Sequence, residues 1–259
     1  ASGLLPLCFG AATKFSQAGL DADKRYLATL RLGQRTTSGD AEGDIVQRRE
    51  VALERSTIEA ALARFTGAIE QLPPMFSALK HEGRALYDYA RSGLAVERQP
   101  RRVTIHRIDL VGWQHDTLVL DVHCSKGTYI RTLADDLGEA LGCGAHLSAL
   151  RRTAGGALGI AAASTLEALG ALDEPQRDAR LLPPDALLSS WPRVQLANAE
   201  AARFLTGLRR RVGLDDAAAV RVYGPNDAFL GSAHITGGEL IADRLLTPAE
   251  VAGCTEPRP

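Results

Sequence analysis

A segment of alternating apolar residues, followed at once by a helix-like apolar stripe, places the strongest constraint on how this chain can fold. The alternating positions are Leu118, Leu120, Val122 and Cys124, and this period of two predicts a strand with one buried face. After Ser125-Lys126-Gly127-Thr128, apolar residues recur at helical spacing, at Ile130, Leu133, Leu137 and Leu141. The order of strand, glycine turn and helix therefore predicts that the first helical turn, with Tyr129 and Arg131, lies beside the end of a sheet.

Other patterns in the first two thirds of the chain predict a mixed sheet with flanking helices. Residues 24–33 alternate as a strand with Tyr26 on its apolar face, and residues 102–112 form a strand that turns back at His115-Asp116. Ser56-Thr57-Ile58-Glu59 has the spacing of a capping box and predicts a helix that begins there. A shorter helix fits residues 83–92. We therefore expect an α/β (α+β) fold.

The last third of the chain has a different pattern. A segment that holds four prolines between residues 173 and 192 predicts a boundary. Three short β-like runs follow it, at residues 218–223, 228–235 and 239–246, with glycine-containing turns between them. We expect one domain over residues 1–185 and a small β-rich domain over residues 190–259.

Composition excludes several classes of protein. The 259 residues carry a formal net charge of −1, and no apolar run approaches the ~20 residues of a membrane helix.

The four cysteines contain no C-x-x-C pair, which favours reduced thiols in a cytoplasmic protein. His123 and His146, with Cys124 and Cys143, match no common zinc spacing, so we expect them to pack and predict no metal site. The acidic loop 40–44 lacks the spacing of a calcium loop, which favours a solvated turn.

Basic residues form three clusters in this nearly neutral chain. They are Arg98 with Arg101 and Arg102, Arg151 with Arg152, and Arg209 to Arg211. Each cluster alone is typical of a solvated face, but three together favour a polyanionic partner. The helix start near Lys126 and Gly127 could also attract an anion. The alternative for Arg131 is a plain surface pair with Asp135, one helical turn later.

Several segments, taken together and in order, resemble one known family. They are residues 4–15, 23–26, 32–36, 73–80, 86–91, 123–132 and 142–146. These motifs are similar to those of the TruB pseudouridine synthases, and they cover nearly all of the first domain. The C-terminal module resembles the family's PUA-type RNA-binding domain more loosely.

The resemblance implies an activity and a partner. The family isomerises uridine 55 of the tRNA T loop to pseudouridine: it flips the base out, breaks the glycosidic bond and rejoins the uracil through C5. It implies no cofactor and no metal. It implies the tRNA T stem-loop as the partner, with no membrane, no obligatory protein partner and a monomeric protein.

Individual site residues follow from the same resemblance. Tyr26 matches the tyrosine that stacks on the flipped uracil and is implicated in removing the C5 proton, and Tyr129 matches a second substrate-contacting tyrosine. Arg131 matches the arginine that pairs with the catalytic carboxylate, and Leu150 matches an apolar wall. The RNA-contacting candidates are Lys14, Lys80, Arg101, Arg102, Arg151, Arg152, Arg209, Arg210 and Arg211.

The resemblance also raises an expectation about the nucleophile. Ala1-Ser2-Gly3 matches the end of the family's first motif, G-x-L-D-P-x-A-x-G, whose Asp would stand three positions before Ala1. We therefore expect residues 1–259 alone to be inactive. The alternatives are a guide-RNA-dependent rRNA pseudouridine synthase and a non-catalytic RNA-binding protein. Residues 77–101 argue against the former, because they resemble an insertion of the stand-alone bacterial enzymes.

Overall fold

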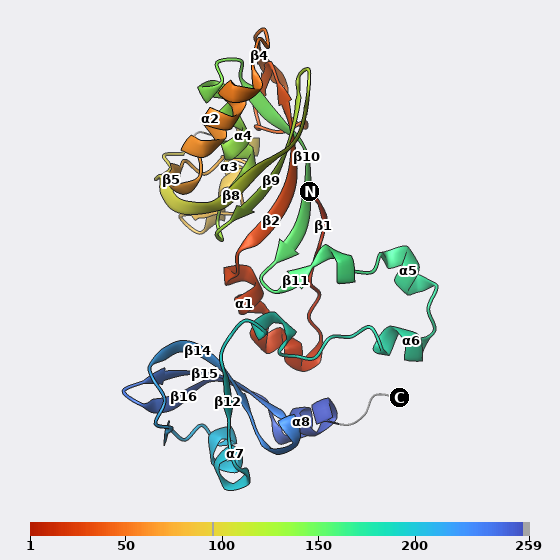
Figure 1. Ribbon diagram of the computed structural model, residues 1–259, viewed down its shortest axis with the longest axis vertical. Helices are drawn as coiled ribbons and strands as arrows, with labels where there is room; N and C mark the ends of the chain where they lie inside the picture. The colour runs from red at the N-terminus through yellow and green to blue at the C-terminus, as the bar shows by residue number, and fades with distance from the viewer. Residues whose placement is uncertain (95, 256–259) are drawn as a thin grey trace. The chain divides into compact units, whose positions relative to one another are not determined.

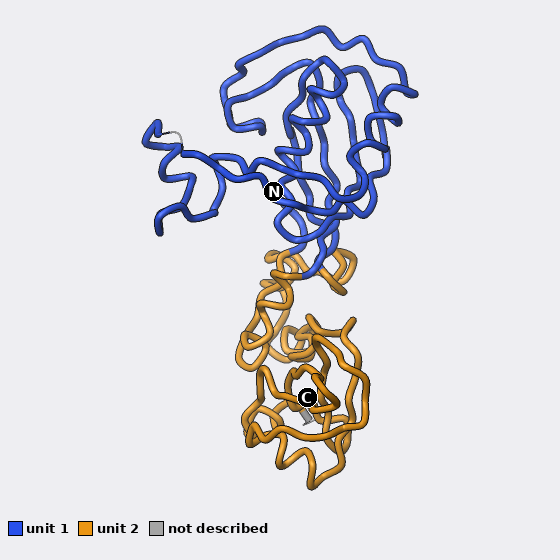
Figure 2. Tube along the Cα trace, turned by 90° about the vertical axis from the view of Figure 1, so that its left-hand side faces the viewer, with its two compact units in different colours: residues 1–4, 22–155 blue, residues 5–21, 156–259 orange. Residues whose placement is uncertain are grey.

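The chain forms two compact units, each with its own sheet and its own core (Figure 2). The computed structural model describes residues 1–94 and 96–255. Unit 1 consists of Ala1–Leu4 and Ala22–Gly155, and unit 2 consists of Leu5–Asp21 and Gly156–Pro259. Within the described residues, no helix is both long and apolar enough to cross a membrane. The domain boundary expected between residues 185 and 190 stays a prediction.

Unit 1 contains a mixed sheet in the order β1-β10-β2-β9-β8-β5. Its strands are β1 (Ser2–Gly3), β2 (Lys24–Leu32), β5 (Gly67–Gln71), β8 (Arg101–Gln114), β9 (Thr117–Cys124) and β10 (Ala145–Gly155). β1 runs parallel to β10, and the other neighbours are antiparallel. Two small hairpins join β3 (Gln34–Thr36) with β4 (Ile45–Arg48) and β6 (Lys80–His81) with β7 (Arg84–Ala85). The predicted mixed-sheet α/β fold is confirmed.

Two helices, α2 (Arg55–Arg64) and α4 (Ile130–Ala140), cover one face of this sheet (Figure 1). Ile58 of α2 and Leu137 of α4 are fully buried against the alternate residues of β2, namely Ala28, Leu30 and Leu32. Burying a leucine or isoleucine side chain stabilises the fold by about 1.5–3 kcal/mol. The apolar faces expected for residues 24–33, 117–124 and the helix after Thr128 are therefore the faces that form the core.

Two helices predicted for unit 1 are present, but their starts differ from the prediction. The helix predicted to begin with a capping box at Ser56 begins at Arg55, with Glu54 at its N-cap and no side-chain cap bond. Glu59 instead accepts a hydrogen bond from Arg55 Nε at 2.7 Å. In the segment 83–92, the first residues form β7, and helix α3 is confined to Leu86–Arg91.

Unit 2 contains a sheet in the order β12-β14-β15-β16-β13. Its strands are β12 (Arg193–Gln195), β13 (Arg210–Arg211), β14 (Ala217–Tyr223), β15 (Phe229–Thr236) and β16 (Glu239–Leu245). The short strand β11 (Leu158–Gly159) is not part of this sheet. The helices of unit 2 are η1 (Gly10–Phe15), α1 (Ser16–Asp21), η2 (Ile160–Ala162), α5 (Leu166–Gly170), α6 (Glu174–Asp178), η3 (Ala186–Leu188), α7 (Asn198–Leu205), η4 (Pro225–Asp227) and α8 (Pro248–Thr255). The three predicted β runs match β14, β15 and β16, so the β-rich second module is confirmed.

The core of unit 2 includes a segment from the start of the chain. Phe204 of α7 packs with Val220 and Leu240 of the sheet. On the same unit, Phe15 lies 5.2 Å from Phe229 between ring centroids, and both belong to a buried cluster with Leu188.

Gly138 provides a test of the packing in unit 1. A Cβ at this helical position would lie 2.1 Å from Ala145 N, so α4 approaches the start of β10 too closely for any side chain. We expect Gly138→Ala to lower the free energy of unfolding by about 1–3 kcal/mol, the usual cost of overpacking. The measurement is equilibrium urea denaturation. Gly170→Ala in α5 is the matched control, because a Cβ there meets nothing within 4 Å. Equal stability of the two variants would contradict the close packing of α4.

Candidate active site

Tyr26 lies on the helix-covered face of β2, opposite Val122 of β9 and Arg152 of β10. Its ring is half-buried against the core. Burial raises the pKa of its hydroxyl above the usual 10.0, and Cys124 raises it further, while Arg152 opposes the shift. The hydroxyl is therefore uncharged at neutral pH and can donate or accept a hydrogen bond.

Leu150 and Arg152 share this face with Tyr26, because Leu150 is opposite Ala28 in the register of β10 and β2. Leu150 packs partly buried against the core. Arg152 Nε donates to Leu4 O at 2.5 Å, and Leu4 N donates to Arg152 O at 2.8 Å. A Cβ on Gly3 would lie 2.3 Å from Arg152 O, so β1 can pair here only with glycine at this position.

Tyr129 is the N-cap residue of α4, and a buried glutamine fixes its backbone. Gln71, the last residue of β5, is 1% exposed. Its Oε1 accepts from Tyr129 N at 2.9 Å, and its Nε2 donates to Tyr129 O at 3.2 Å. The sequence analysis missed Gln71. A single polar residue at the end of a strand gives no signal until its partner, 58 residues away, is known.

Arg131 points from the first turn of α4 toward a loop rather than along its own helix. Its Nη1 donates to Asp40 Oδ2 at 2.8 Å, and its Nη2 donates to Phe76 O at 2.6 Å. Asp135 is held instead by Arg35, through Nε at 2.7 Å and Nη2 at 2.9 Å. The structure therefore contradicts the alternative in which Arg131 forms a surface pair with Asp135.

Asp40 is the second site feature that the sequence analysis missed. The acidic loop was expected to be a solvated turn, yet the Asp40 side chain is only 22% exposed and pairs with Arg131. Burial would raise the pKa of this carboxyl, but bonds from the Ser38 hydroxyl, the Glu42 amide and Arg131 outweigh it, and the pKa is lowered. Asp40 is thus an ionised, oriented carboxylate at the start of α4.

The sheet residues and the α4 residues adjoin the same core. Tyr26 and Leu150 pack against the cluster that contains Ile130, which stands between Tyr129 and Arg131 in the chain. All four predicted pocket residues thus belong to unit 1 and lie in or next to its core. Their roles in the reaction stay predictions.

The predicted RNA-contacting residues are spread over both units. Lys80, Arg101, Arg102 and Arg151 are exposed on unit 1, and Arg209 and Arg211 are exposed on unit 2. Two others already have carboxylate partners within unit 2. Lys14 Nζ lies 2.6 Å from Glu250 Oε2, and Arg210 pairs with Glu200. These positions leave the proposed RNA contacts untested.

Family models match the chain over almost its whole length. The model described as TruB family pseudouridylate synthase (N terminal domain) matches residues 1–130, and the tRNA pseudouridylate synthase B C-terminal domain matches residues 131–189. The model for Pseudouridine synthase II TruB, C-terminal, matches residues 192–246. The chain belongs to the TruB family. The resemblance found in its motifs is thereby confirmed.

Individual proteins similar to this TruB family member support the same family assignment. It is 55% identical over 253 residues to a tRNA pseudouridine synthase B of Burkholderia mallei, covering 95% of this chain and 84% of that protein. It is 54% identical over 256 residues to one of Ralstonia nicotianae, covering 95% and 82%. Among solved structures, a chain of a Cbf5-Nop10-Gar1 complex matches with a TM-score of 0.72 at 22% identity, covering 95% of this chain and 73% of that chain. At this identity the structural match supports the fold alone.

The lowered pKa of Asp40 predicts a pH-dependent contribution to stability. A carboxyl whose pKa is lower in the folded state stabilises the fold above its unfolded pKa, about 4, and loses that effect as the pH falls through the folded value. We expect Asp40→Asn to lower the free energy of unfolding by about 1–3 kcal/mol at pH 7. The difference from the wild type should shrink as the pH approaches 3.

Urea denaturation over this pH range measures the effect. Glu42→Gln, in the same loop but with an exposed side chain, is the control. A deficit of Asp40→Asn that stays constant down to pH 3 would show that the Asp40 charge is not what stabilises the loop.

Proposed function

We propose that this protein isomerises uridine 55 in the T loop of tRNA to pseudouridine. The observation that carries the proposal is the 55% identity, over 95% of the chain, to a protein named tRNA pseudouridine synthase B. The target base must leave its stack to react, and enzymes that do chemistry on a base extrude it in this way. A hairpin loop suits such recognition, because its bases are already partly unstacked.

Tyr26 is proposed to receive the flipped uracil. An aromatic ring replaces the stacking that the base loses, and this is worth about 1–3 kcal/mol per base. The ring is held on β2 between two neighbouring strands, and Leu150 provides an apolar wall on the same face. Its uncharged hydroxyl is suited to relay the C5 proton through a hydrogen bond, whereas taking that proton as a base would require the phenolate.

Tyr129 and Arg131 are proposed to complete the site from the first turn of α4. Gln71 holds the backbone at Tyr129 through two hydrogen bonds at the start of the helix. A guanidinium has five N–H donors, and the bonds to Asp40 and Phe76 use two of them. We propose that Arg131 also orients the carboxylate that starts the family's reaction and keeps it ionised.

We further propose that the enzyme acts alone, as a monomer in the cytoplasm, with tRNA as its partner. The four cysteines are free thiols, in keeping with a reducing compartment. The alternative is a guide-dependent enzyme acting on rRNA. The closer sequence relatives favour tRNA as the substrate.

The first experiment assays the complete gene product with an unmodified T-arm hairpin and no guide RNA. We expect stoichiometric pseudouridine at position 55 and none in a hairpin with cytidine at that position. Tyr26→Phe should keep RNA binding but lose about 10²–10⁴-fold in single-turnover rate, the size typical of a lost acid–base group. Tyr26→Leu should be slower still, because it also removes the aromatic ring.

Melting temperatures of both variants serve as the control for folding. A Tyr26→Phe enzyme with near-normal turnover would remove the hydroxyl from the mechanism and leave Tyr129 as the next candidate. Activity that requires an added guide RNA would favour the guide-dependent alternative.

The second experiment concerns the basic cluster of unit 2. Arg209 and Arg211 are exposed, whereas Arg210 is paired with Glu200. We expect Arg209→Ala with Arg211→Ala to weaken tRNA binding and to reduce the slope of log affinity against log salt by about 0.7–0.9 for each lost phosphate contact. Turnover at saturating RNA should be unchanged, because phosphate contacts position the RNA and do not select the base.

Arg210→Ala is the matched control, and we expect it to change the salt slope least. Affinity is measured by filter binding between 50 and 200 mM salt. A protein that makes about 10 phosphate contacts loses much of its affinity over this range. An unchanged slope in the double variant would show that this cluster is only solvated surface.

A further inference from the structure

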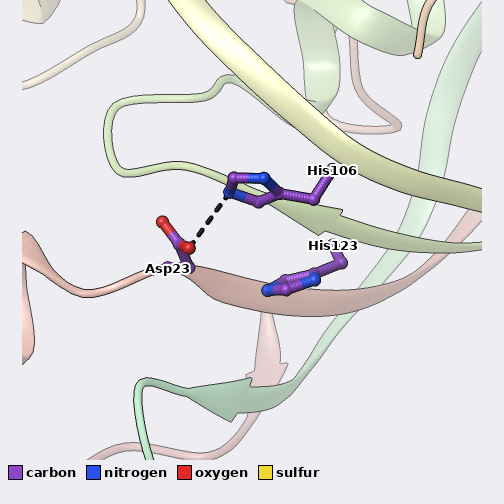
Figure 3. A group of neighbouring side chains, drawn as sticks. All are labelled: Asp23, His106 and His123. Atoms are coloured by element: carbon purple, nitrogen blue, oxygen red, sulfur yellow. Dashed lines mark ion pairs between the residues drawn. The ribbon is translucent and has the colours of Figure 1, made fainter. Parts of the chain in front are cut away.

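We propose that Asp23, His106 and His123 bind a divalent transition-metal ion of the zinc type. Figure 3 shows the three side chains converging from three segments of unit 1. Asp23 immediately precedes β2, His106 belongs to β8 and His123 belongs to β9. One donor atom from each residue lies within 4.8 Å of the others. Among the residues that the structure describes, this is the one such group of three.

The donor set suits zinc. Sites with three protein ligands commonly combine imidazole nitrogens with a carboxylate oxygen, and water takes the fourth position. Donors around a tetrahedral zinc ion lie roughly 3.3 Å apart, given metal–ligand distances of about 2.0–2.2 Å. His106 Nε2 and Asp23 Oδ2 are already 3.0 Å apart. The His106 and His123 rings lie 4.8 Å apart between centroids, and both side chains are exposed. To bind the same ion, the His123 imidazole has to turn toward the other two donors.

The backbone supports this convergence. In the pairing of β8 with β9, Ile105 is opposite Cys124 and Arg107 is opposite His123, so His106 is the extra residue of a β-bulge. Bulges bend a strand and re-aim a side chain. His106 thus reaches toward Asp23, although β9 lies between β8 and β2 in the sheet.

The site lies on the face of the sheet opposite to Tyr26. Tyr26 is paired with Val122, which is fully buried on the helix-covered face, whereas the adjacent His123 is exposed. This geometry differs from the metal alternative weighed on the sequence, which joined His123 with Cys124. Cys124 is buried in the core, so these two neighbours point to opposite faces.

Nearby cations have their own partners. Arg25 is opposite His123 in the sheet, and its Nε lies 2.7 Å from Asp121 Oδ1. Arg107, next to His106, has its Nε 2.5 Å from Asp109 Oδ2. The carboxylate of Asp23 is therefore paired with an imidazole rather than with a guanidinium.

The ion would tie the start of β2 to β8 and β9. A ligand that binds only the folded state raises the melting temperature in a concentration-dependent way. We expect zinc to raise the melting temperature increasingly as its concentration rises.

The test titrates untagged, metal-free protein with zinc chloride by calorimetry and with cobalt chloride by absorption. We expect one ion per chain and cobalt bands typical of nitrogen and oxygen ligands, without an intense thiolate charge-transfer band. That band would reveal binding to the cysteines instead and would overturn the proposal. His106→Ala and His123→Ala should each weaken binding at least about tenfold.

His234→Ala is the matched control. His234 also pairs with a carboxylate, Asp243, at 2.8 Å, but among the described residues it belongs to no group of three possible metal ligands. Its zinc affinity should equal that of the wild type. Asp23→Asn, which keeps the size of the side chain, repeats the test should a histidine variant fold poorly. Zinc binding that is absent at micromolar concentrations, or unchanged in the variants, would show that His106 and Asp23 form only a surface ion pair.

Discussion

The position of β2 between β9 and β10 is the constraint on which the rest of unit 1 depends. Both edges of the strand are paired along nearly its whole length, so its register is fixed from two sides. Alternate residues then point to opposite faces, and a slip of one residue would exchange the two sets. Tyr26 faces the helices for this reason, while Arg25 points to the other face. The candidate uridine site and the candidate metal site are therefore two sides of one strand.

The start of α4 is organised by polar contacts from distant segments. Gln71 holds the backbone of Tyr129, and Asp40 holds the guanidinium of Arg131. Both partners are largely buried, so each bond acts where water competes little. Tyr129 and Arg131 are thereby held by contacts within the chain, the kind of preorganisation that the proposed function would use.

Periodic features could be predicted from the sequence, and non-local polar contacts could not. The alternation in residues 24–33 and 117–124 gave β2 and β9, because burial imposes that period directly. Asp40 looked like part of a solvated turn, because its partner Arg131 is 91 residues away. The grouping of Asp23 with His106 depends on a bulge in β8, and no local sequence pattern predicts this bulge. The capping-box prediction was wrong because the helix begins one residue before Ser56. Ser56 is therefore a helical residue and not the N-cap, although its spacing from Glu59 fits the motif.

Residues 5–21 fold with the C-terminal part of the chain in unit 2, and this affects the order in which the protein can fold. Phe15 and Lys14 are synthesised early, but their partners Phe229 and Glu250 come near the end of the chain. Lys14 and Glu250 are 236 positions apart, so at ordinary translation rates the first waits on the order of ten to fifty seconds for the second. During that interval Phe15 has no native place to bury its ring. Unit 2 can therefore finish folding only after its C-terminal strands and α8 have been made.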